Sequence, residues 1–145
     1  MIERFQRAEG RRRLIEALAG QRIVGGNHSI AEELAEEAVL LEVEAGADII
    51  TEGAVDNDVY FLLAGCVAVV DGDRQLAVRH AGQHVGEMAL IDPTASRSAT
   101  VIAREATVLA KVSASTFRRI ADRYPYMWRS LAIELGDRLR QRKGT

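Results

Sequence analysis

A Gly-Glu pair followed by an arginine is the part of this sequence best suited to chemistry. The residues are Gly86, Glu87 and, ten positions after the glutamate, Arg97. A carboxylate can accept a hydrogen bond from a sugar hydroxyl, and a guanidinium presents planar donors that match two phosphate oxygens. Gly86 allows close backbone approach, and the amides of residues 87–89 would point at an anion if they begin a helical turn. The spacing suits a small ligand with a sugar and a phosphate. Taken alone, it also fits a surface charge and a simple ion pair.

Residues 85–101 resemble the phosphate-binding cassette of the cyclic nucleotide-binding domain family. That cassette reads Gly-Glu-hydrophobic-Ala-Leu, then a short loop, then Arg-small-Ala, and each part is present between Gly86 and Ala99. The spacing from Glu to Arg is that of the bacterial catabolite-activator branch. Segments 46–53 and 60–65 also look like the strand-turn pattern of the family, so the resemblance covers about residues 35–142.

The resemblance implies a role for residues in the cassette and the last helix. Glu87 is expected to accept a hydrogen bond from the ribose 2′-hydroxyl, and Arg97 to bind the cyclic phosphate. The Ser98 hydroxyl donates to the phosphate, reaches a base in the syn conformation, or simply faces solvent. Arg138 reaches the ligand or Glu87, or faces solvent. The expected ligand-binding residues are Gly86, Glu87, Met88, Ala89, Arg97, Ser98, Ala99 and Arg138.

Two positions depart from the family pattern. The family often has Phe before Gly-Glu, where this chain has Val85, and Pro before the arginine, where it has Ser96. These changes leave the phosphate and ribose contacts in place but weaken any inference about the base. Tyr126 and Trp128 near the start of the last helix either stack on a base or pack in the core or an interface, and packing is the more common role of such aromatics.

The sequence lacks the usual patterns of catalysis. His28, His80 and His84 are too scattered for a metal site, and there is no P-loop, nucleophile elbow or Rossmann glycine run. His84, beside the cassette, is expected to be structural. The chain is therefore expected to be no enzyme, with no metal and no cofactor; its ligand is a cyclic nucleotide monophosphate. The single cysteine, Cys66, is expected to be a buried thiol, which fits a reducing cytoplasm.

Composition indicates one soluble domain. The 145 residues are 48% hydrophobic and 28% charged, enough to build a core. A net charge of −2 does not favour a nucleic-acid surface, and the basic residues near both ends are interpreted as solvated helix faces. No apolar segment approaches membrane-spanning length. We therefore expect a cytoplasmic protein that contacts neither membrane nor DNA directly.

Short runs rich in Val, Ile and Leu predict an antiparallel β-roll, jelly-roll-like, within an α+β fold. The expected strands are 38–43, 48–51, 58–63, 66–70, 75–79, 99–103 and 106–112. Residues 1–20 have helical periodicity, and the pattern from Ser29 to Glu32 predicts a capping box at the start of a second helix. Asp71-Gly72 is expected to form a hairpin turn.

Two C-terminal helices are expected to follow the roll. Ser113 or Ser115 caps the first, Tyr124-Pro125 interrupts it, and the second is amphipathic. Its apolar stripe comprises Trp128, Leu131, Leu135 and Leu139. One small domain is not expected to cover this stripe fully, so the helix predicts a homodimer. A single domain then spans 1–145, with a helical lead-in at 1–36, the roll at 37–112 containing the cassette at 85–101, and helices at 113–143.

Within the family, segments 11–18, 56–61, 82–93 and 135–142 look like the sensor half of bacterial Pycsar antiphage effectors. That resemblance implies cUMP or cCMP as the ligand and a following TIR-type domain that degrades NAD⁺. We therefore expect a cyclic nucleotide sensor that repositions its last helix and activates an output domain in cis, absent from this chain. One alternative is the ligand-binding domain of a cAMP- or cGMP-responsive transcription regulator. Another is an interaction module that has lost its site, against which intact Glu87 and Arg97 argue.

Overall fold

The strands follow the predicted runs closely. The computed structural model describes residues 1–143, with side chains described as far as residue 141. The strands are β1 (Val39–Val43), β2 (Asp48–Ile50), β3 (Val59–Ala64), β4 (Cys66–Asp71), β5 (Arg74–His80), β6 (His84–Val85), β7 (Thr100–Ala103) and β8 (Thr107–Val112). The predicted hairpin between β4 and β5 is present, and its two turn residues are Gly72 and Asp73, one position later than predicted. Strand β6 was not predicted, because two residues carry no periodic signal.

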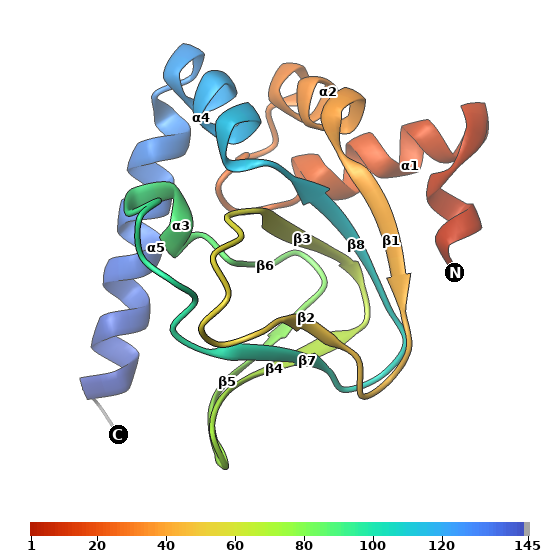
Figure 1. The fold of residues 1–145 in the computed structure, drawn as a ribbon. Helices are drawn as coiled ribbons and strands as arrows, with labels where there is room; N and C mark the ends of the chain where they lie inside the picture. The colour runs from red at the N-terminus through yellow and green to blue at the C-terminus, as the bar shows by residue number, and fades with distance from the viewer. Residues whose placement is uncertain (144–145) are drawn as a thin grey trace.

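Within the described residues the strands form two four-stranded sheets that face each other as a roll (Figure 1). One sheet has the order β1–β8–β3–β6 and the other β2–β7–β4–β5. The paired strands are antiparallel throughout. The predicted α+β fold with an antiparallel β-roll between helices is therefore confirmed. The short strand β6, at the edge of the first sheet, leads directly into the cassette.

The helices lie before the roll, within the cassette and after the roll. They are η1 (Ile2–Phe5), α1 (Arg7–Ala19), α2 (His28–Glu37), α3 (Met88–Ile91), α4 (Ala114–Arg123) and α5 (Tyr126–Lys143). In Figure 1, α1 and α2 cover the β1–β8 side of the roll, and α5 runs along its other flank beside α3. Residues 144 and 145, at the end of the domain predicted over 1–145, lie outside the described residues.

The first predicted helix is interrupted. Gln6 is extended and Arg7 has a φ of 61°, which separates η1 from α1. The break turns Phe5 back over Gly10, where an added Cβ would lie 2.4 Å from the Phe5 carbonyl carbon. Phe5 is buried in the core as a result. The prediction of one continuous helix over residues 1–20 was therefore wrong, because the chain breaks at Gln6 between η1 and α1.

The helix caps decide two further predictions. The second helix begins at His28 and not at Ser29, because Asn27 is its N-cap and accepts a hydrogen bond from the Ile30 amide at 3.1 Å. The predicted capping box was therefore wrong. Of the two candidate caps for α4, Ser113 is the residue used, and its hydroxyl accepts from the Thr116 amide at 3.2 Å.

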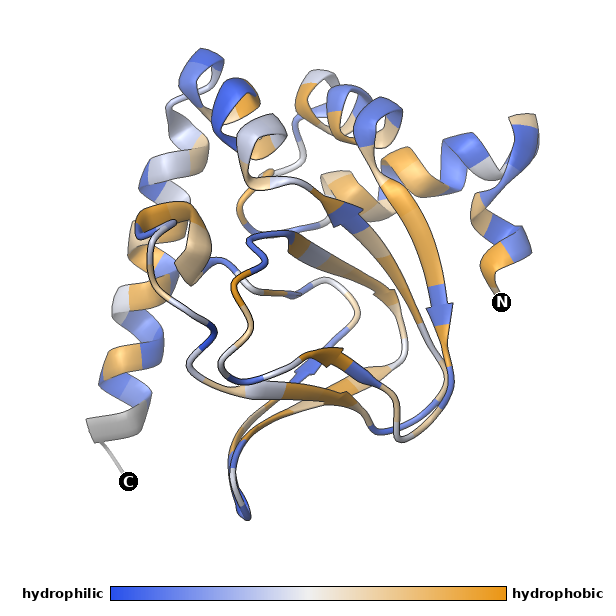
Figure 2. Cartoon of the chain, in the orientation of Figure 1, coloured by the Kyte–Doolittle hydropathy of each residue, from blue (hydrophilic) through white to orange (hydrophobic). Residues whose placement is uncertain are grey.

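Two hydrophobic clusters lie on opposite faces of the first sheet. The alternation of β3 shows the arrangement, because Phe61 belongs to the cluster under the helices while Leu62 belongs to the cluster inside the roll. Val85 of β6 also belongs to the inner cluster. Figure 2 shows the corresponding hydrophobic residues along the strands. The cassette therefore begins at the edge of a packed apolar interior.

The last helix is covered unevenly. Leu131 is buried, Leu135 is partly buried, and Leu139 is 65% exposed. Trp128 packs edge-on against Phe117, with ring centroids 5.7 Å apart, so core packing is its role. The predicted apolar stripe is present, but of its three leucines only Leu131 is fully covered within this domain. Ile133 is a further exposed apolar residue of α5.

Cys66 was predicted to be a buried thiol, and this was wrong: it begins β4 and is only half-buried. Over residues 1–143, no helix combines the length and apolar composition needed to cross a membrane. In the same residues, no group of three or more His, Cys, Asp and Glu side chains is placed to hold a metal ion.

Candidate functional site

Gly86 follows β6 at the start of the cassette and contacts Arg97 near its end. Its φ is 88°, a conformation that favours glycine. An added Cβ would lie 2.7 Å from the carbonyl oxygen of Asp58 and 3.1 Å from Nη1 of Arg97. A side chain here would therefore displace both the neighbouring loop and the arginine. The glycine predicted to permit close backbone approach is required by the cassette's own packing.

Arg97 is buried, with 7% of its surface exposed, and its guanidinium holds three separate groups. Nη1 donates to the Gly86 carbonyl at 3.0 Å. Nη2 donates to Asp56 Oδ2 at 2.8 Å and to the Asp58 carbonyl at 2.6 Å. The Arg97 backbone also pairs with the loop that precedes β3, since its amide donates to Ala54 O at 2.8 Å. Arg97 thus presents a fixed positive charge beside Gly86.

Tyr60 and two aspartates surround this guanidinium. Burial raises the pKa of the Tyr60 hydroxyl, and the charges of Asp56 and Asp58 raise it further while Arg97 lowers it. Tyr60 therefore stays neutral at physiological pH. Tyr60 and Asp56 were not among the predicted site residues, although both lie in segment 56–61, which carried part of the family resemblance.

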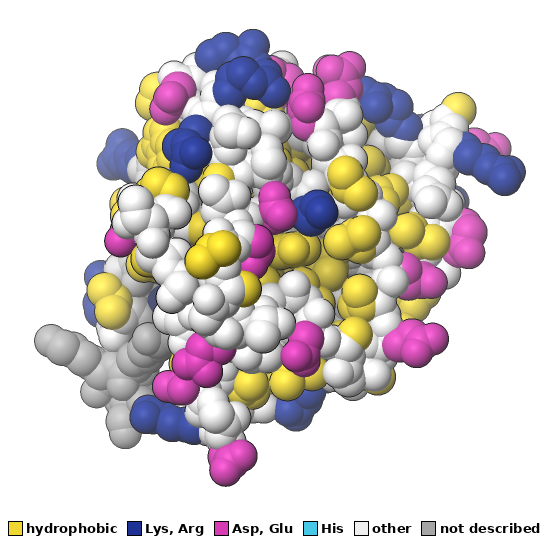
Figure 3. Space-filling view, viewed as in Figure 1, with side chains coloured by type: hydrophobic (Ala, Val, Ile, Leu, Met, Phe, Trp, Pro, Cys, Tyr) yellow, Lys and Arg dark blue, Asp and Glu magenta, His cyan; other side chains and the backbone are white. Residues whose placement is uncertain are grey.

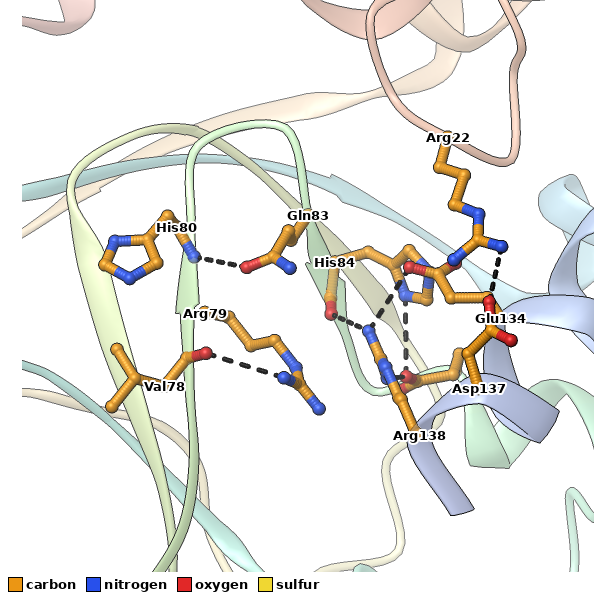
Figure 4. Close-up of polar contacts among 10 residues, drawn as sticks. Arg22, Val78, Arg79, His80, Gln83, His84, Glu134, Asp137 and Arg138 are labelled. Carbon is orange, nitrogen blue, oxygen red and sulfur yellow. Dashed lines mark hydrogen bonds and ion pairs between the residues drawn. The ribbon is translucent and has the colours of Figure 1, made fainter. Parts of the chain in front are cut away.

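Glu87 is also buried, with 6% exposed, and its partner comes from α5. Arg138 Nη1 donates to Glu87 Oε1, while Arg138 Nη2 donates to the His84 carbonyl at 3.4 Å. Figure 4 shows Arg138 reaching from the helix toward His84. Of the alternatives for Arg138, contact with Glu87 is the one that the structure contains. Glu87 and Arg97 therefore pair with other residues: Glu87 pairs with Arg138, and Arg97 pairs with Asp56.

A second residue of α5 contacts the strand before the cassette. His84 Nε2 lies 2.8 Å from Glu134 Oε2, and both side chains are buried (Figure 4). Burial raises the pKa of Glu134, but the hydrogen bond from His84 and the charges of His84 and Arg138 outweigh it, so the pKa lies below its usual value. We call His84, Glu87, Glu134 and Arg138 the α5 ion cluster. Sequence analysis missed Glu134, whose one signal is its spacing of four residues from Arg138.

The other expected site residues vary in exposure. Met88 and Ser98 are exposed, Ala89 is buried and Ala99 is half-buried. Residues 88–91 form the helical turn that the sequence analysis invoked for phosphate binding. Tyr126, the other aromatic considered for base stacking, lies at the start of α5 against Gly25.

A surface cavity of about 350 Å³ lies away from the cassette. It is lined by Val24, Gly25, Asn27, Ile30, Arg123, Tyr124, Pro125 and Tyr126. None of these residues belongs to the α5 ion cluster or to the Arg97 contacts. The eight residues that the sequence predicted to bind a ligand therefore lie outside the lining of this cavity.

Comparison with known proteins identifies the class of domain. The family described as "Cyclic nucleotide-binding domain" matches residues 40–124, which include the whole cassette and most of the roll. The chain belongs to this family. Two solved structures share the fold with a TM-score of 0.70 each: the regulatory domain of Toxoplasma gondii PKA with cAMP (24% identity, 80% of this chain, 46% of that one) and Thermus thermophilus Catabolite Activator Protein (25%, 79% and 56%).

Several Pycsar effector proteins are similar to nearly the whole of this chain. The chain is 48% identical to the Pycsar effector protein PaPycTIR of Pseudomonas aeruginosa over 98% of this chain and 46% of that protein. It is 42% identical to BcPycTIR of Burkholderia cepacia (98% and 47%) and 43% identical to XpPycTIR of Xanthomonas perforans (98% and 47%). The chain is thus homologous to Pycsar effector proteins and spans about half of their length.

Proposed function

We propose that this chain is the sensor domain of a Pycsar-type antiphage effector, which binds a 3′,5′-cyclic nucleotide monophosphate and activates an output domain in cis. The observation that carries the proposal is the burial of both Glu87 and Arg97 within one cassette, where Arg97 donates to the carbonyl of Gly86, the residue before Glu87. Buried charges are retained where they bind an ion or a partner. The similarity to Pycsar effector proteins over nearly the whole chain supports the effector assignment.

Phosphate binding requires an exchange of partners at Arg97. The Asp56 carboxylate is 40% exposed and occupies Nη2, whereas the Gly86 and Asp58 carbonyls are backbone groups of the cassette and its neighbouring loop. Phosphate oxygens replace Asp56 at Nη2, because a dispersed anionic charge suits the planar guanidinium. The turn at Met88 and Ala89 and the exposed Ser98 hydroxyl supply further donors, and Ala99 lies against the phosphate.

Ribose binding provides the signal. The 2′-hydroxyl donates to Glu87, which at present accepts from Arg138 of α5. Competition at one carboxylate changes the contact between α5 and the roll, so nucleotide and helix position become coupled. A coupling of about 1–3 kcal/mol changes the population of the active helix position by roughly 5–150-fold. The chain itself senses and does not catalyse.

The proposed ligand is cUMP or cCMP, and the proposed output is a TIR-type domain that degrades NAD⁺. Both proposals rest on the similarity to the PycTIR proteins. This chain covers about half of their length, which leaves the other half of each for an output domain. The alternative is the ligand-binding domain of a cAMP- or cGMP-responsive transcription regulator. It is favoured by the structural likeness to a catabolite activator protein.

Calorimetric titration of the purified chain with cUMP, cCMP, cAMP and cGMP separates these readings. Selective binding of a pyrimidine nucleotide supports the effector sensor. Selective binding of cAMP or cGMP supports the regulator. Binding of none of the four overturns the proposal and favours an interaction module.

We also propose that the chain forms a homodimer through α5 and that it acts in the cytoplasm. Leu139 and Ile133 are the large apolar side chains of α5 that are exposed beyond its first residue, Tyr126, within the part of the helix whose side chains are described. We expect a dimeric mass by light scattering and a monomeric mass for Leu139→Glu. A control, Val39→Glu, changes an exposed apolar residue of β1, away from α5. A monomeric wild-type chain at high concentration contradicts this part of the proposal.

A further inference from the structure

His84 is an unusual residue to find fully buried in the strand that precedes the cassette. It is 1% exposed and its ring packs edge-on against Phe61, with centroids 6.3 Å apart. A phenylalanine or leucine would fill such a position without polar atoms. A buried imidazole costs free energy unless its nitrogen atoms have partners. The contacts of its two nitrogens therefore indicate why a histidine stands here.

The two nitrogens face two different carboxylates. Nε2 is hydrogen-bonded to Glu134 Oε2 at 2.8 Å. Because an ionised carboxylate only accepts, Nε2 carries a hydrogen. Nδ1 is buried, makes no hydrogen bond, and lies 3.6 Å from Glu87 Oε1. The charged groups around the imidazole are thus Glu87 beside it and Glu134 and Arg138 of α5, with Arg22 acting on Glu134 through its charge.

This arrangement matters when Glu87 exchanges partners. Arg138 is the donor that holds the Glu87 carboxylate in the structure. If a ribose hydroxyl weakens that contact, Glu87 remains a buried carboxylate that needs a second donor. The Nδ1 atom of His84 is 3.6 Å away, and a movement of about 0.7 Å brings it within hydrogen-bond distance. When Nδ1 takes up a proton from solvent, the ring donates to Glu134 from Nε2 and to Glu87 from Nδ1.

We propose that His84 is a positioning residue that holds Glu87 in place for the ribose 2′-hydroxyl, with Glu134 orienting the imidazole. The inference rests on the proposed cyclic nucleotide site and adds to it a residue outside the Gly-Glu to Arg cassette. It makes the distinction between ribose and deoxyribose depend on a contact with α5. His84 acts through Glu87 and does not touch the phosphate.

The test compares each nucleotide with its 2′-deoxy analogue. Affinities for cUMP and 2′-deoxy-cUMP, or for the same pair of whichever nucleotide the titration selects, are measured by calorimetry on one preparation. The variants are His84→Leu, which removes both nitrogens, and His84→Asn, which keeps a donor near the position of Nδ1. Glu134→Gln removes the charge that orients the ring. His80→Leu is the matched control, because His80 is an exposed histidine on β5.

We expect the wild-type chain and His80→Leu to prefer the ribonucleotide. His84→Leu should reduce that preference about tenfold, the effect of losing one hydrogen bond to a charged group. His84→Asn should recover part of it, and Glu134→Gln should lower it less than His84→Leu. Because a partly unfolded fraction cancels from the ratio, a purely structural role weakens both ligands equally and leaves the preference unchanged.

An unchanged preference in His84→Leu overturns the inference while leaving the proposed function intact. Absence of nucleotide binding by the wild-type chain overturns the proposed function itself, so the two failures are distinguishable. If His84→Leu does not fold, the comparison of His84→Asn and Glu134→Gln with the wild-type chain decides. Wild-type preference in both of these variants contradicts the positioning role.

Discussion

The two ends of the cassette are held by different parts of the molecule. At one end, Arg97 contacts Gly86, Asp56 and Asp58, which all belong to the roll and its loops. At the other end, Glu87 is held by Arg138, which belongs to α5. Both side chains are buried, yet only the second one connects the roll to the last helix through the α5 ion cluster.

This difference separates anchoring from signalling. A ligand group at Arg97 meets a site whose parts are tied together by backbone hydrogen bonds across the loop before β3. A ligand group at Glu87 competes with a contact between two elements that are far apart in the sequence. A ligand changes an equilibrium only through contacts that differ between two states. We therefore expect affinity to depend mainly on Arg97 and the response to depend mainly on the α5 ion cluster. Figure 3, viewed as in Figure 1, shows hydrophobic side chains over the strands of the roll, with acidic and basic side chains among them and around them.

The largest effect should follow from Arg97→Ala. The variant loses the phosphate contacts of a charged, planar donor, so affinity should fall about a hundredfold or more. The domain should still unfold cooperatively, although the Gly86 and Asp58 carbonyls lose their partner. Calorimetry and thermal unfolding measure both. Arg104→Ala is the control, since Arg104 is an exposed arginine that contacts Gln75 at 2.6 Å. Full affinity in Arg97→Ala would remove the anchoring role.

Glu87→Gln should have an intermediate effect on affinity. The amide keeps the size of the side chain but loses the charge that accepts from the ribose and from Arg138. We expect about a tenfold loss for the ribonucleotide and little loss for its 2′-deoxy analogue. Equal losses for the two ligands would place Glu87 in the packing and not at the ribose.

Arg138→Gln should change affinity least among the three charged residues and change the response most. Removing the competing donor from Glu87 should raise affinity a few-fold, by less than the tenfold that one hydrogen bond to a charged group provides. Arg140→Gln is the control, because Arg140 is an exposed arginine of the same helix that pairs with Asp137. A large loss of affinity in Arg138→Gln would show that Arg138 binds the ligand directly.

The smallest effect concerns pH. The pKa of Glu134 is lowered in the folded chain, so its contribution to stability is present above its usual value of 4.5 and is lost as pH falls through the folded value. The unfolding temperature of the wild-type chain should therefore fall more steeply than that of Glu134→Gln as the pH falls from about 6 to about 3. Parallel curves for the two proteins would indicate that Glu134 gains nothing from His84 and Arg138 in the fold.

Local patterns in the sequence predicted the strands of the roll and the interruption at Tyr124-Pro125, which follow from periodicity and proline geometry. A family motif within one short segment selected Glu87 and Arg97, and their roles in binding stay predictions. The partners of the charged residues did not follow, because the contact of Arg97 with Asp56 spans 41 residues and that of His84 with Glu134 spans 50. Such pairs depend on how the roll and α5 pack.

Errors at the helix starts have a more local origin. Asn27 and Ser29 are both good N-cap residues, and the sequence pattern favoured Ser29 because Glu32 completes a capping box. The structure uses Asn27, whose side chain bonds the Ile30 amide. The break at Arg7 depends on Phe5 packing over Gly10, a contact that helical periodicity does not describe.

Hydrogen exchange of α5 with and without bound nucleotide tests the central claim most directly. The account predicts that nucleotide changes the protection of amides in α5, while Arg138→Gln binds the nucleotide with a much smaller change there. It also predicts that amides of β3 and β8 change little in both proteins. Nucleotide binding that leaves α5 protection unchanged in the wild-type chain would contradict the role of this domain as a sensor.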